Sequence, residues 1–309
     1  MEGIRGLHHI TAIASDARRN YEFYTKVLGL RLVKKTVNFD DPNTYHFYYG
    51  DEVGHAGTIL TFFPWEGIGK GYNGTGMATS IGYSISKESL NFWEERFNQF
   101  NVTHENVSEK FGEEYLSFQD PDGLNIDLIV PKNKDERKPW DKNGVNAEMA
   151  LKGFHSITLT LKSSKPTAAI LTGILGYELQ EQQGNHYRFV TDAVDNANII
   201  DIVESPEASR GHVAAGTNHH VAFRVKDDNI LMEYREKVLS MGLNITPKIN
   251  RDYFLSLYFR EPGGVLFELA SENPGFTIDE PMDQLGTLLK LPRQYESSRA
   301  KIEAILPQI

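Results

Sequence analysis

Four stretches of the chain carry apolar residues at three- and four-residue spacing, which is the pattern of a helix with one buried face. Three of these stretches end in glycine, the residue that most easily closes a helix in the left-handed conformation. Shorter runs of β-branched and aromatic residues precede and follow each stretch, and these runs predict strands. The predicted helices cover residues 16–29, 87–100, 164–176 and 227–242.

The order strand, helix and about three strands occurs four times. The sequence also repeats itself, since GLHHITAI at 6–13 resembles GFHSITLT at 153–160, and DPDGLNIDLIV at 120–130 resembles EPGGVLFELAS at 261–271. Repeated segments at nearly one offset indicate duplication. We therefore predict an α+β fold in which four βαβββ modules form two half-open barrels. The modules cover about 6–66, 76–131, 153–205 and 216–271.

A charged, proline-containing stretch at 131–144 is the best candidate for a linker between halves. It divides the chain into a first pair of modules, 1–131, and a second pair, 145–271. The remaining tail, 272–309, is expected to contain one amphipathic helix that packs on the outside.

Composition narrows the class of protein. The chain has 309 residues, 40% of them hydrophobic, and a net charge of −10. With no basic patch, nucleic acid is not an expected partner. Because cysteine is absent, thiolate chemistry and disulfides are excluded. No apolar run approaches the roughly 20 residues that span a bilayer, so no membrane contact is expected and the expected location is the cytoplasm.

Two of the module-opening strands begin with histidine doublets, His8–His9 and His219–His220. In every module, polar and apolar residues alternate along the first strand and along the last strand. When the four first strands are aligned with one another, and the four last strands likewise, one position in each strand faces the same side of a sheet. In the first strands this position holds His9, Ser80, Ser156 and His220, and in the last strands it holds Thr61, Asp127, Asp201 and Glu268.

Only the combination of modules one and four supplies two histidines and a carboxylate, namely His9, His220 and Glu268. Two imidazoles and one carboxylate are the ligand set of non-haem iron(II), with coordination positions left open. Glu268 lies among apolar residues of its strand, where a carboxylate needs a cation or a hydrogen bond. Serine is a poor ligand for such a metal, so Ser80 and Ser156 indicate that the corresponding positions of modules two and three do not bind one. The alternative interpretation is that these histidines are ordinary core residues.

Four βαβββ modules with a histidine on the first strand resemble the vicinal oxygen chelate superfamily. That group includes glyoxalase I, fosfomycin and bleomycin resistance proteins, and type I extradiol dioxygenases. The resemblance rests on LHHITAIASD, NHHVAFRV and EPGGVLFELA. The phrase FYTKVLGLRLVKKTVNFDDPNTYHFYYGD and the tail ending LGTLLKLPRQYE…IEAILP resemble the ring-cleaving dioxygenases that act on hydroquinones.

This resemblance favours His9 and His220 as the ligand members of the doublets and implies roles for further residues. His8 and His219 point away from the ligand side if the strands are regular, and serve either as packing residues or as groups that orient ligands and move protons. Arg251 and Tyr258 are expected near the substrate, where Arg251 pairs with a phenolate and Tyr258 handles a proton. Thr11 shares the ligand side with His9. The other histidines, including His46, are expected to be structural or solvated.

The leading functional hypothesis is an iron(II) extradiol-type dioxygenase that inserts O₂ into a hydroquinone- or catechol-like diol, with manganese(II) as the alternative metal. Its partners are then a small aromatic substrate and O₂. A glyoxalase-like lyase or isomerase, and a ligand-sequestering resistance protein without a metal, are the competing classes. A homo-oligomer in which a neighbouring subunit donates the first module gives the same ligand set.

Overall fold

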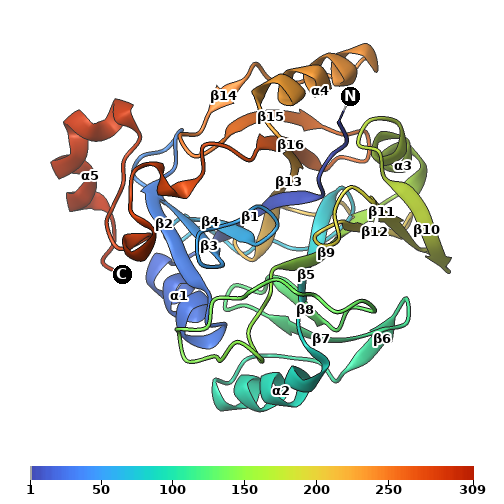
Figure 1. The fold of residues 1–309 in the computed structure, drawn as a ribbon, viewed down its shortest axis with the longest axis horizontal. Helices are drawn as coiled ribbons and strands as arrows, with labels where there is room; N and C mark the ends of the chain where they lie inside the picture. Colours follow the sequence, from blue (N-terminus) through green and yellow to red (C-terminus); the bar gives the residue numbers. More distant parts are fainter. Residues whose placement is uncertain (1) are drawn as a thin grey trace.

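The computed structural model describes residues 2–309 and contains two curved eight-stranded sheets (Figure 1). In the first sheet the strand order is β14-β15-β16-β13-β1-β4-β3-β2. Its strands are β1 (Leu7–Ala14), β2 (Arg31–Val37), β3 (Tyr45–Gly50), β4 (Ile59–Pro64), β13 (Thr217–Val225), β14 (Ile249–Asn250), β15 (Leu255–Arg260) and β16 (Leu266–Ser271).

The second sheet has the strand order β10-β11-β12-β9-β5-β8-β7-β6. Its strands are β5 (Met77–Ser84), β6 (Ser108–Lys110), β7 (Glu113–Gln119), β8 (Asn125–Ile129), β9 (Phe154–Leu161), β10 (Glu178–Gln183), β11 (His186–Val190) and β12 (Ile199–Glu204). The two half-open sheets with few helices confirm the predicted α+β fold built from four βαβββ modules.

Each predicted helix is present. They are α1 (Ala17–Glu22), which continues as a π-helical turn over Phe23–Val27, α2 (Leu90–Gln99) after a short 3₁₀ turn at Lys87–Ser89, α3 (Ser164–Gly173) and α4 (Asp228–Ser240). Gly29, Gly176 and Gly242 follow three of these helices with φ of 72°, 74° and 76°, as the sequence predicted. Their left-handed backbone turns the chain back toward the next strand.

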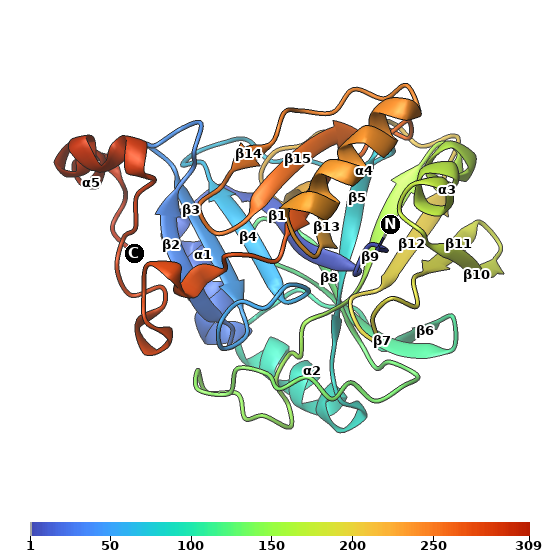
Figure 2. The ribbon, with the colours of Figure 1, turned by 45° about the horizontal axis from the view of Figure 1, so that its top comes forward.

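The sheets combine modules that are distant in sequence. In the centre of the first sheet, β1 of module one pairs antiparallel with β13 of module four, and in the second sheet β5 of module two pairs antiparallel with β9 of module three. Figure 2 shows β1 beside β13 and β5 beside β9, where the two sheets approach each other. The linker therefore divides the chain in sequence only. Modules one and four form the first sheet, and modules two and three form the second.

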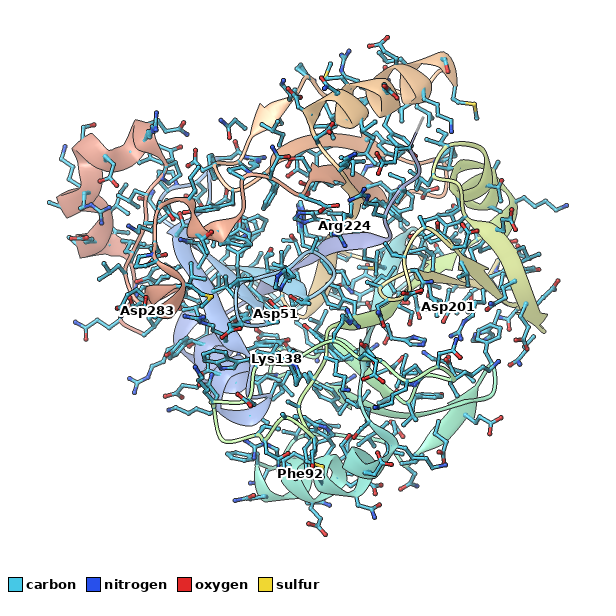
Figure 3. The ribbon with its side chains drawn as sticks, in the orientation of Figure 1. Asp51, Phe92, Lys138, Asp201, Arg224 and Asp283 are labelled. Atoms are coloured by element: carbon cyan, nitrogen blue, oxygen red, sulfur yellow. The ribbon has the colours of Figure 1, made fainter. Side chains whose placement is uncertain are left out.

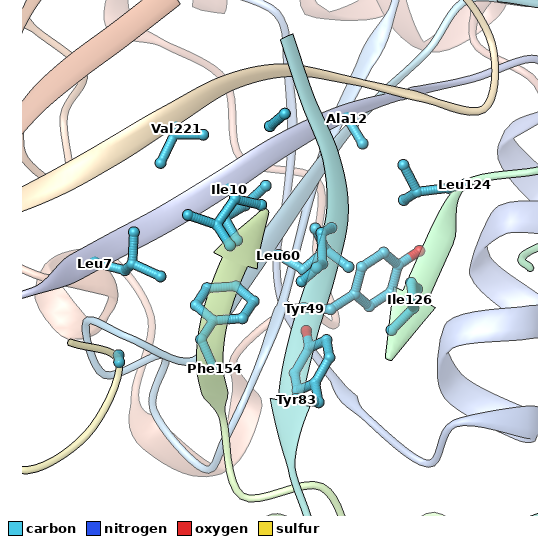
Figure 4. Packing of buried hydrophobic residues seen from close by; sticks show 14 of the residues in the cluster. Leu7, Ile10, Ala12, Tyr49, Leu60, Tyr83, Leu124, Ile126, Phe154 and Val221 are labelled. Atoms are coloured by element: carbon cyan, nitrogen blue, oxygen red, sulfur yellow. The ribbon is translucent and has the colours of Figure 1, made fainter. Parts of the chain in front are cut away.

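The largest core cluster lies where the two sheets face each other (Figure 4). Leu7 and Ile10 of β1 point toward Tyr83 and Phe154 of the second sheet, and all four are fully buried. From Ile10 onward, the residues of β1 that alternate with this apolar set face the opposite, concave side, because side chains alternate across a strand. The extra residue His8 interrupts the alternation and places Leu7 on the same side as Ile10. Packing of the two sheets therefore fixes which residues of β1 line the hollow of the first sheet.

The tail packs along the β2 and β3 end of the first sheet, where the Phe276 ring lies 5.1 Å from that of Tyr48 and Tyr45 donates a hydrogen bond to the Pro307 carbonyl. It contains 3₁₀ turns at Phe276–Ile278, Met282–Gln284 and Arg293–Ser298, followed by α5 (Arg299–Ile305). Ile302 of α5 is buried and Ile305 is exposed, so the helix is amphipathic as predicted. Within residues 2–309, none of the helices combines the length and the apolar character needed to cross a membrane.

Candidate metal centre

Three side chains from three strands of the first sheet meet in its hollow. His9 lies on β1, His220 on β13 and Glu268 on β16, and all three are buried. The Nε2 atoms of the two histidines are 3.3 Å apart, and the Glu268 Oε2 atom lies 3.1 Å from His9 Nε2 and 2.9 Å from His220 Nε2. These atoms can hold one metal ion between them.

The strand register explains why residues so distant in sequence converge. β13 lies between β1 and β16, and His220 is paired with Thr11 of β1 while Ala222 is paired with Glu268 of β16. Neighbouring strands are about 4.8 Å apart, so side chains at matched positions on one side of three adjacent strands come within contact. The combination of modules one and four that the ligand register predicted is therefore the one that the sheet forms.

The two oxygens of Glu268 have different surroundings. Oε1 accepts a hydrogen bond from the Ser256 hydroxyl at 2.5 Å. Oε2 is buried and has no hydrogen-bond partner among residues 2–309, although it lies within ion-pair distance of both imidazoles. Burial favours the neutral acid, but His9 and His220 hold the pKa of Glu268 well below its usual value. A buried carboxylate oxygen without a hydrogen bond, beside two imidazole nitrogens, fits a divalent metal.

Each histidine doublet forms a side-chain pair. His8 Nδ1 lies 2.9 Å from His9 Nδ1, and His219 Nδ1 lies 2.8 Å from His220 Nδ1. The expectation that His8 and His219 point away from the ligand side required regular strands, and it is wrong because both strands are bulged. His8 is an extra residue in the pairing of β1 with β13, and His219 is an extra residue in the same ladder. A bulge re-aims the side chain of the extra residue.

His8 and His219, the first histidine of each doublet, have strongly lowered pKa values. Burial lowers the pKa of both His8 and His219 to about 3. The adjacent histidine contributes secondly, because its positive charge when protonated opposes a second charge. Both side chains are therefore neutral at pH 7. Burial also lowers the pKa of His220. A neutral His8 can accept a hydrogen bond from the Nδ1–H of His9, which leaves the Nε2 lone pair of His9 free for a metal. His219 can do the same for His220.

A cavity of about 370 Å³ opens beside His9 and His220. Aromatic side chains form much of its wall, and the polar groups among its lining residues include Arg251 and Tyr258. The Tyr258 ring meets the His220 ring edge-on at 5.6 Å, and the Arg251 guanidinium lies 5.6 Å from the centre of the Tyr258 ring. Burial raises the pKa of Tyr258, so its hydroxyl stays protonated. The phenylalanine and tryptophan residues of the wall are Phe39, Phe63, Trp65 and Phe254, and Tyr48 and Tyr258 add two phenol rings.

Arg251 lies at the rim of this cavity. Burial acts against its charge, but Tyr258 and Asp40 raise the pKa of Arg251 above its usual value. Its Nη2 atom lies 3.5 Å from Oδ2 of Asp40, whose side chain is exposed. The Arg251 guanidinium also lies over the Phe39 ring at 5.2 Å, so one cation connects the rim to the aromatic wall.

The sequence did not single out His46 and Tyr48, and both line the cavity. The expectation that His46 is only structural or solvated is incomplete, since His46 is buried and bonded to the Tyr48 hydroxyl and to Thr61. A signal was present in TYHFYYG, where the alternation places His46 and Tyr48 on one side of β3. Thr11, which the sequence placed beside His9, is hydrogen bonded to Thr61.

The second sheet has the same architecture without the ligands. The corresponding positions hold Ser80, Ser156, Asp127 and Asp201. Lys110 Nζ lies 2.7 Å from Asp127 Oδ2, and Arg188 binds Asp201 through Nε and Nη2, both at 2.8 Å (Asp201 is labelled in Figure 3). Side-chain cations therefore neutralise these carboxylates. The hydroxyls of Ser80 and Ser156 are buried and have no hydrogen-bond partner in the part of the chain that the structure describes.

Comparison with known proteins places the chain in a family. The model of the Glyoxalase/Bleomycin resistance protein/Dioxygenase superfamily matches residues 6–128 and 153–269. The chain belongs to this superfamily. The match covers all four modules, and it confirms the resemblance that the histidine-bearing strands indicated.

Full-length relatives are similar to the chain from end to end. A protein of Bacillus subtilis (strain 168) named "Putative ring-cleaving dioxygenase MhqO" is 44% identical over 98% of this chain and 96% of its own length. The chlorohydroquinone/hydroquinone 1,2-dioxygenase of Sphingobium indicum is 35% identical over 97% of this chain and 95% of its own length.

Solved structures share the fold. The crystal structure of a "putative dioxygenase" from Bacillus subtilis has a TM-score of 0.96 and 42% identity, and covers 100% of this chain and 98% of that one. Glyoxalase I from Zea mays has a TM-score of 0.65 at 16% identity, and covers 86% of this chain and 92% of that one. At that identity the second likeness concerns the fold alone.

Proposed function

We propose that the chain is a non-haem iron(II) dioxygenase that opens the ring of a hydroquinone-like or catechol-like diol with O₂. The observation that carries the proposal is the convergence of His9 Nε2, His220 Nε2 and the unbonded Glu268 Oε2 beside a cavity with aromatic walls. Two full-length relatives carry names that include ring cleavage or hydroquinone dioxygenation. Manganese(II) accepts a similar donor set and is the alternative metal.

When bound, iron(II) supplies open coordination positions and the one-electron chemistry that O₂ requires. The chain's own residues prepare the site for this ion. His8 and His219 hold the outer histidines in the tautomer that leaves each Nε2 lone pair free. Ser256 binds one Glu268 oxygen and leaves the other free. The ligands therefore need little rearrangement when the metal enters.

The cavity residues act on the organic substrate. Aromatic side chains such as Phe63 and Phe254 provide flat apolar surfaces for a ring and exclude water from it. The Arg251 guanidinium stabilises negative charge on a phenolic oxygen. Tyr258, which keeps its proton at neutral pH, donates a hydrogen bond to an oxygen that gains charge during the reaction.

The test combines metal analysis with oxygen uptake. Protein purified without oxygen should contain iron(II), and should consume O₂ and form a ring-opened product when hydroquinone is added. Glu268→Ala should lose both the metal and the activity, whereas the matched variant Ser80→Ala in the second sheet should keep both. Turnover by metal-free protein would refute the proposal. Isomerisation of a hemithioacetal without oxygen uptake would instead establish a glyoxalase-like activity.

A further inference from the structure

A second, smaller cavity of about 120 Å³ adjoins the proposed metal centre. It shares His219, His220 and Leu266 with the larger cavity, so these three side chains form a common boundary. Leu266 begins β16 two residues before Glu268, and side chains two apart on a strand project to one side, about 7 Å from each other. The small cavity therefore reaches the expected ligand His220 separately from the larger one.

The small cavity also extends to the surface of the protein. Val213 and Arg260 belong to its lining, and both are exposed. Arg260 donates a hydrogen bond from Nη1 to the Gly264 carbonyl at 2.7 Å, which holds its side chain against the turn before β16. The cavity therefore runs between solvent, at Val213, and His220.

The size of this cavity restricts what can enter it. An apolar protein cavity of about 150 Å³ binds benzene or xenon. The small cavity, at about 120 Å³, is smaller than that, whereas the larger cavity has about 370 Å³. An aromatic diol exceeds benzene by two oxygen atoms. A diol therefore fits the larger cavity alone, and a diatomic gas fits both.

The lining suits an apolar gas better than an ordered water. Asn218 Oδ1 is the single buried side-chain polar atom of this lining that lacks a hydrogen-bond partner within residues 2–309. A water that is held in place makes about two to four hydrogen bonds, so one free acceptor holds it poorly. An apolar molecule displaces a poorly held water at little cost. The alkyl side chains of the lining are Met77, Ala78, Val213, Val265 and Leu266.

The two cavities differ in what a bound diol does to them. A reaction between a diol and O₂ needs both molecules at the metal centre at the same time. A ring that lies between the aromatic walls of the larger cavity obstructs it for a second molecule. The small cavity stays free, because the diol does not fit it.

We infer that the small cavity admits O₂ to the metal centre while the larger cavity holds the diol. The inference rests on the proposed function, to which it adds a route for the second substrate. Leu266, His219 and His220 form the inner end of this route, and Val213 forms its mouth. Because Val213 does not line the larger cavity, a substitution there changes the route alone.

The first measurement uses xenon, an apolar atom that needs neither metal nor turnover to bind. Crystals of the protein are pressurised with xenon, and its anomalous scattering locates it. We expect xenon in the small cavity of the unaltered protein. Val213→Trp should lower its occupancy, because the indole fills the outer end of the cavity. A small cavity without xenon in the unaltered protein would overturn the inference.

The second measurement is steady-state oxygen uptake by the iron-loaded protein, with O₂ and hydroquinone varied separately. Val213→Trp should raise the KM for O₂ about tenfold and change the KM for hydroquinone less than about twofold, since the diol cavity is intact. Val213→Ala widens the mouth and should not raise the KM for O₂. The matched control is Val107→Trp, which alters an exposed valine immediately before β6 of the second sheet and should leave both KM values unchanged.

The outcomes separate the inference from the function beneath it. An unaltered KM for O₂ in Val213→Trp would overturn the inference, and equal increases in both KM values would indicate general damage and count against it. Metal content and thermal unfolding of both tryptophan variants establish that the site is intact. If neither hydroquinone nor catechol causes oxygen uptake by the unaltered protein, the proposed function fails and the inference with it. If oxygen uptake occurs with a KM for O₂ that ignores Val213, only the inference fails.

Discussion

The Nδ1 atoms of His219 and His220 lie 2.8 Å apart, although consecutive residues of a strand ordinarily point to opposite sides. The bulge at His219 removes that alternation and turns two neighbouring imidazoles toward each other. Because the same arrangement recurs at His8 and His9, each expected ligand is held by the residue that precedes it.

Removing an expected ligand should remove the metal. His9→Ala and His220→Ala each leave two donors in place of three, and a neutral water is a weaker donor than imidazole. We expect both variants to lose most of their iron in equilibrium dialysis. Ser156→Ala, at the corresponding position of the second sheet, should bind iron like the unaltered protein. Full iron content in either histidine variant would show that the convergence of these side chains does not form a metal site.

Replacing His219, which contacts the expected ligand His220, should weaken metal binding although no expected ligand is removed. We expect His219→Ala to lower iron affinity about 10- to 100-fold, because His220 loses the partner that fixes its tautomer and ring orientation. Competition with a chelator of known affinity measures this change. His104→Ala replaces a histidine at the periphery of the second sheet and serves as the control. An affinity unchanged in His219→Ala would mean that the bulge has only a packing role.

Asp120 should make stability depend on pH. Burial raises its pKa to about 6, so the folded protein binds this proton more tightly than the unfolded chain does. The stabilisation that this proton gives the folded protein is fully present below the ordinary pKa near 3.8, and it is lost as the pH rises through about 6. Asp120→Asn removes this loss and keeps the oxygen that accepts hydrogen bonds from the Asp122 and Leu124 amides.

We therefore expect the free energy of unfolding of Asp120→Asn, relative to the unaltered protein, to increase by about 2–3 kcal/mol between pH 4 and pH 7.5. Urea unfolding at several pH values measures the difference. Tyr24 donates to the other Asp120 oxygen, and the amide that replaces that oxygen can donate to Tyr24 instead. A difference that does not change with pH would contradict the assignment.

Arg188 should be essential for stability of the second sheet. It is buried, binds both oxygens of Asp201 and contacts Glu113. Arg188→Met leaves two buried carboxylates without their cation, and we expect a loss of about 3–5 kcal/mol in urea unfolding. Arg18→Met, which removes an exposed partner of Glu22, should change stability by less than about 0.5 kcal/mol. Adding Glu113→Gln and Asp201→Asn to Arg188→Met should recover part of the loss.

Much of the fold and the expected ligand set could be predicted from the sequence because both follow from local periodicity. The alternation that marks strands also aligns His9, His220 and Glu268, and the repeats fix which strand of each module carries them. The choice between modules followed from chemistry, since only modules one and four together offer two imidazoles and a carboxylate. That choice agrees with the order of strands in the first sheet.

The bulges could not be predicted in the same way. Whether His8 or His219 becomes an extra residue depends on its pairing with a strand about two hundred residues distant, and alternation within one strand carries no information about it. The contribution of His46 also escaped prediction, because its partner Thr61 belongs to another strand, and Thr11, which bonds Thr61, belongs to a third. The sequence shows which side of a strand is polar, and the pairing of strands decides what that side contacts.

The central pairing of β1 with β13 has a consequence for the order of events during synthesis. β4 can join β1 on one side as soon as the first module leaves the ribosome. The other edge of β1 then stays unpaired until residues 217–225 emerge, and an open strand edge can pair with other chains. We expect nascent chains stalled before that point to depend on chaperones and to aggregate readily, because the strand that completes the sheet is among the last to be made.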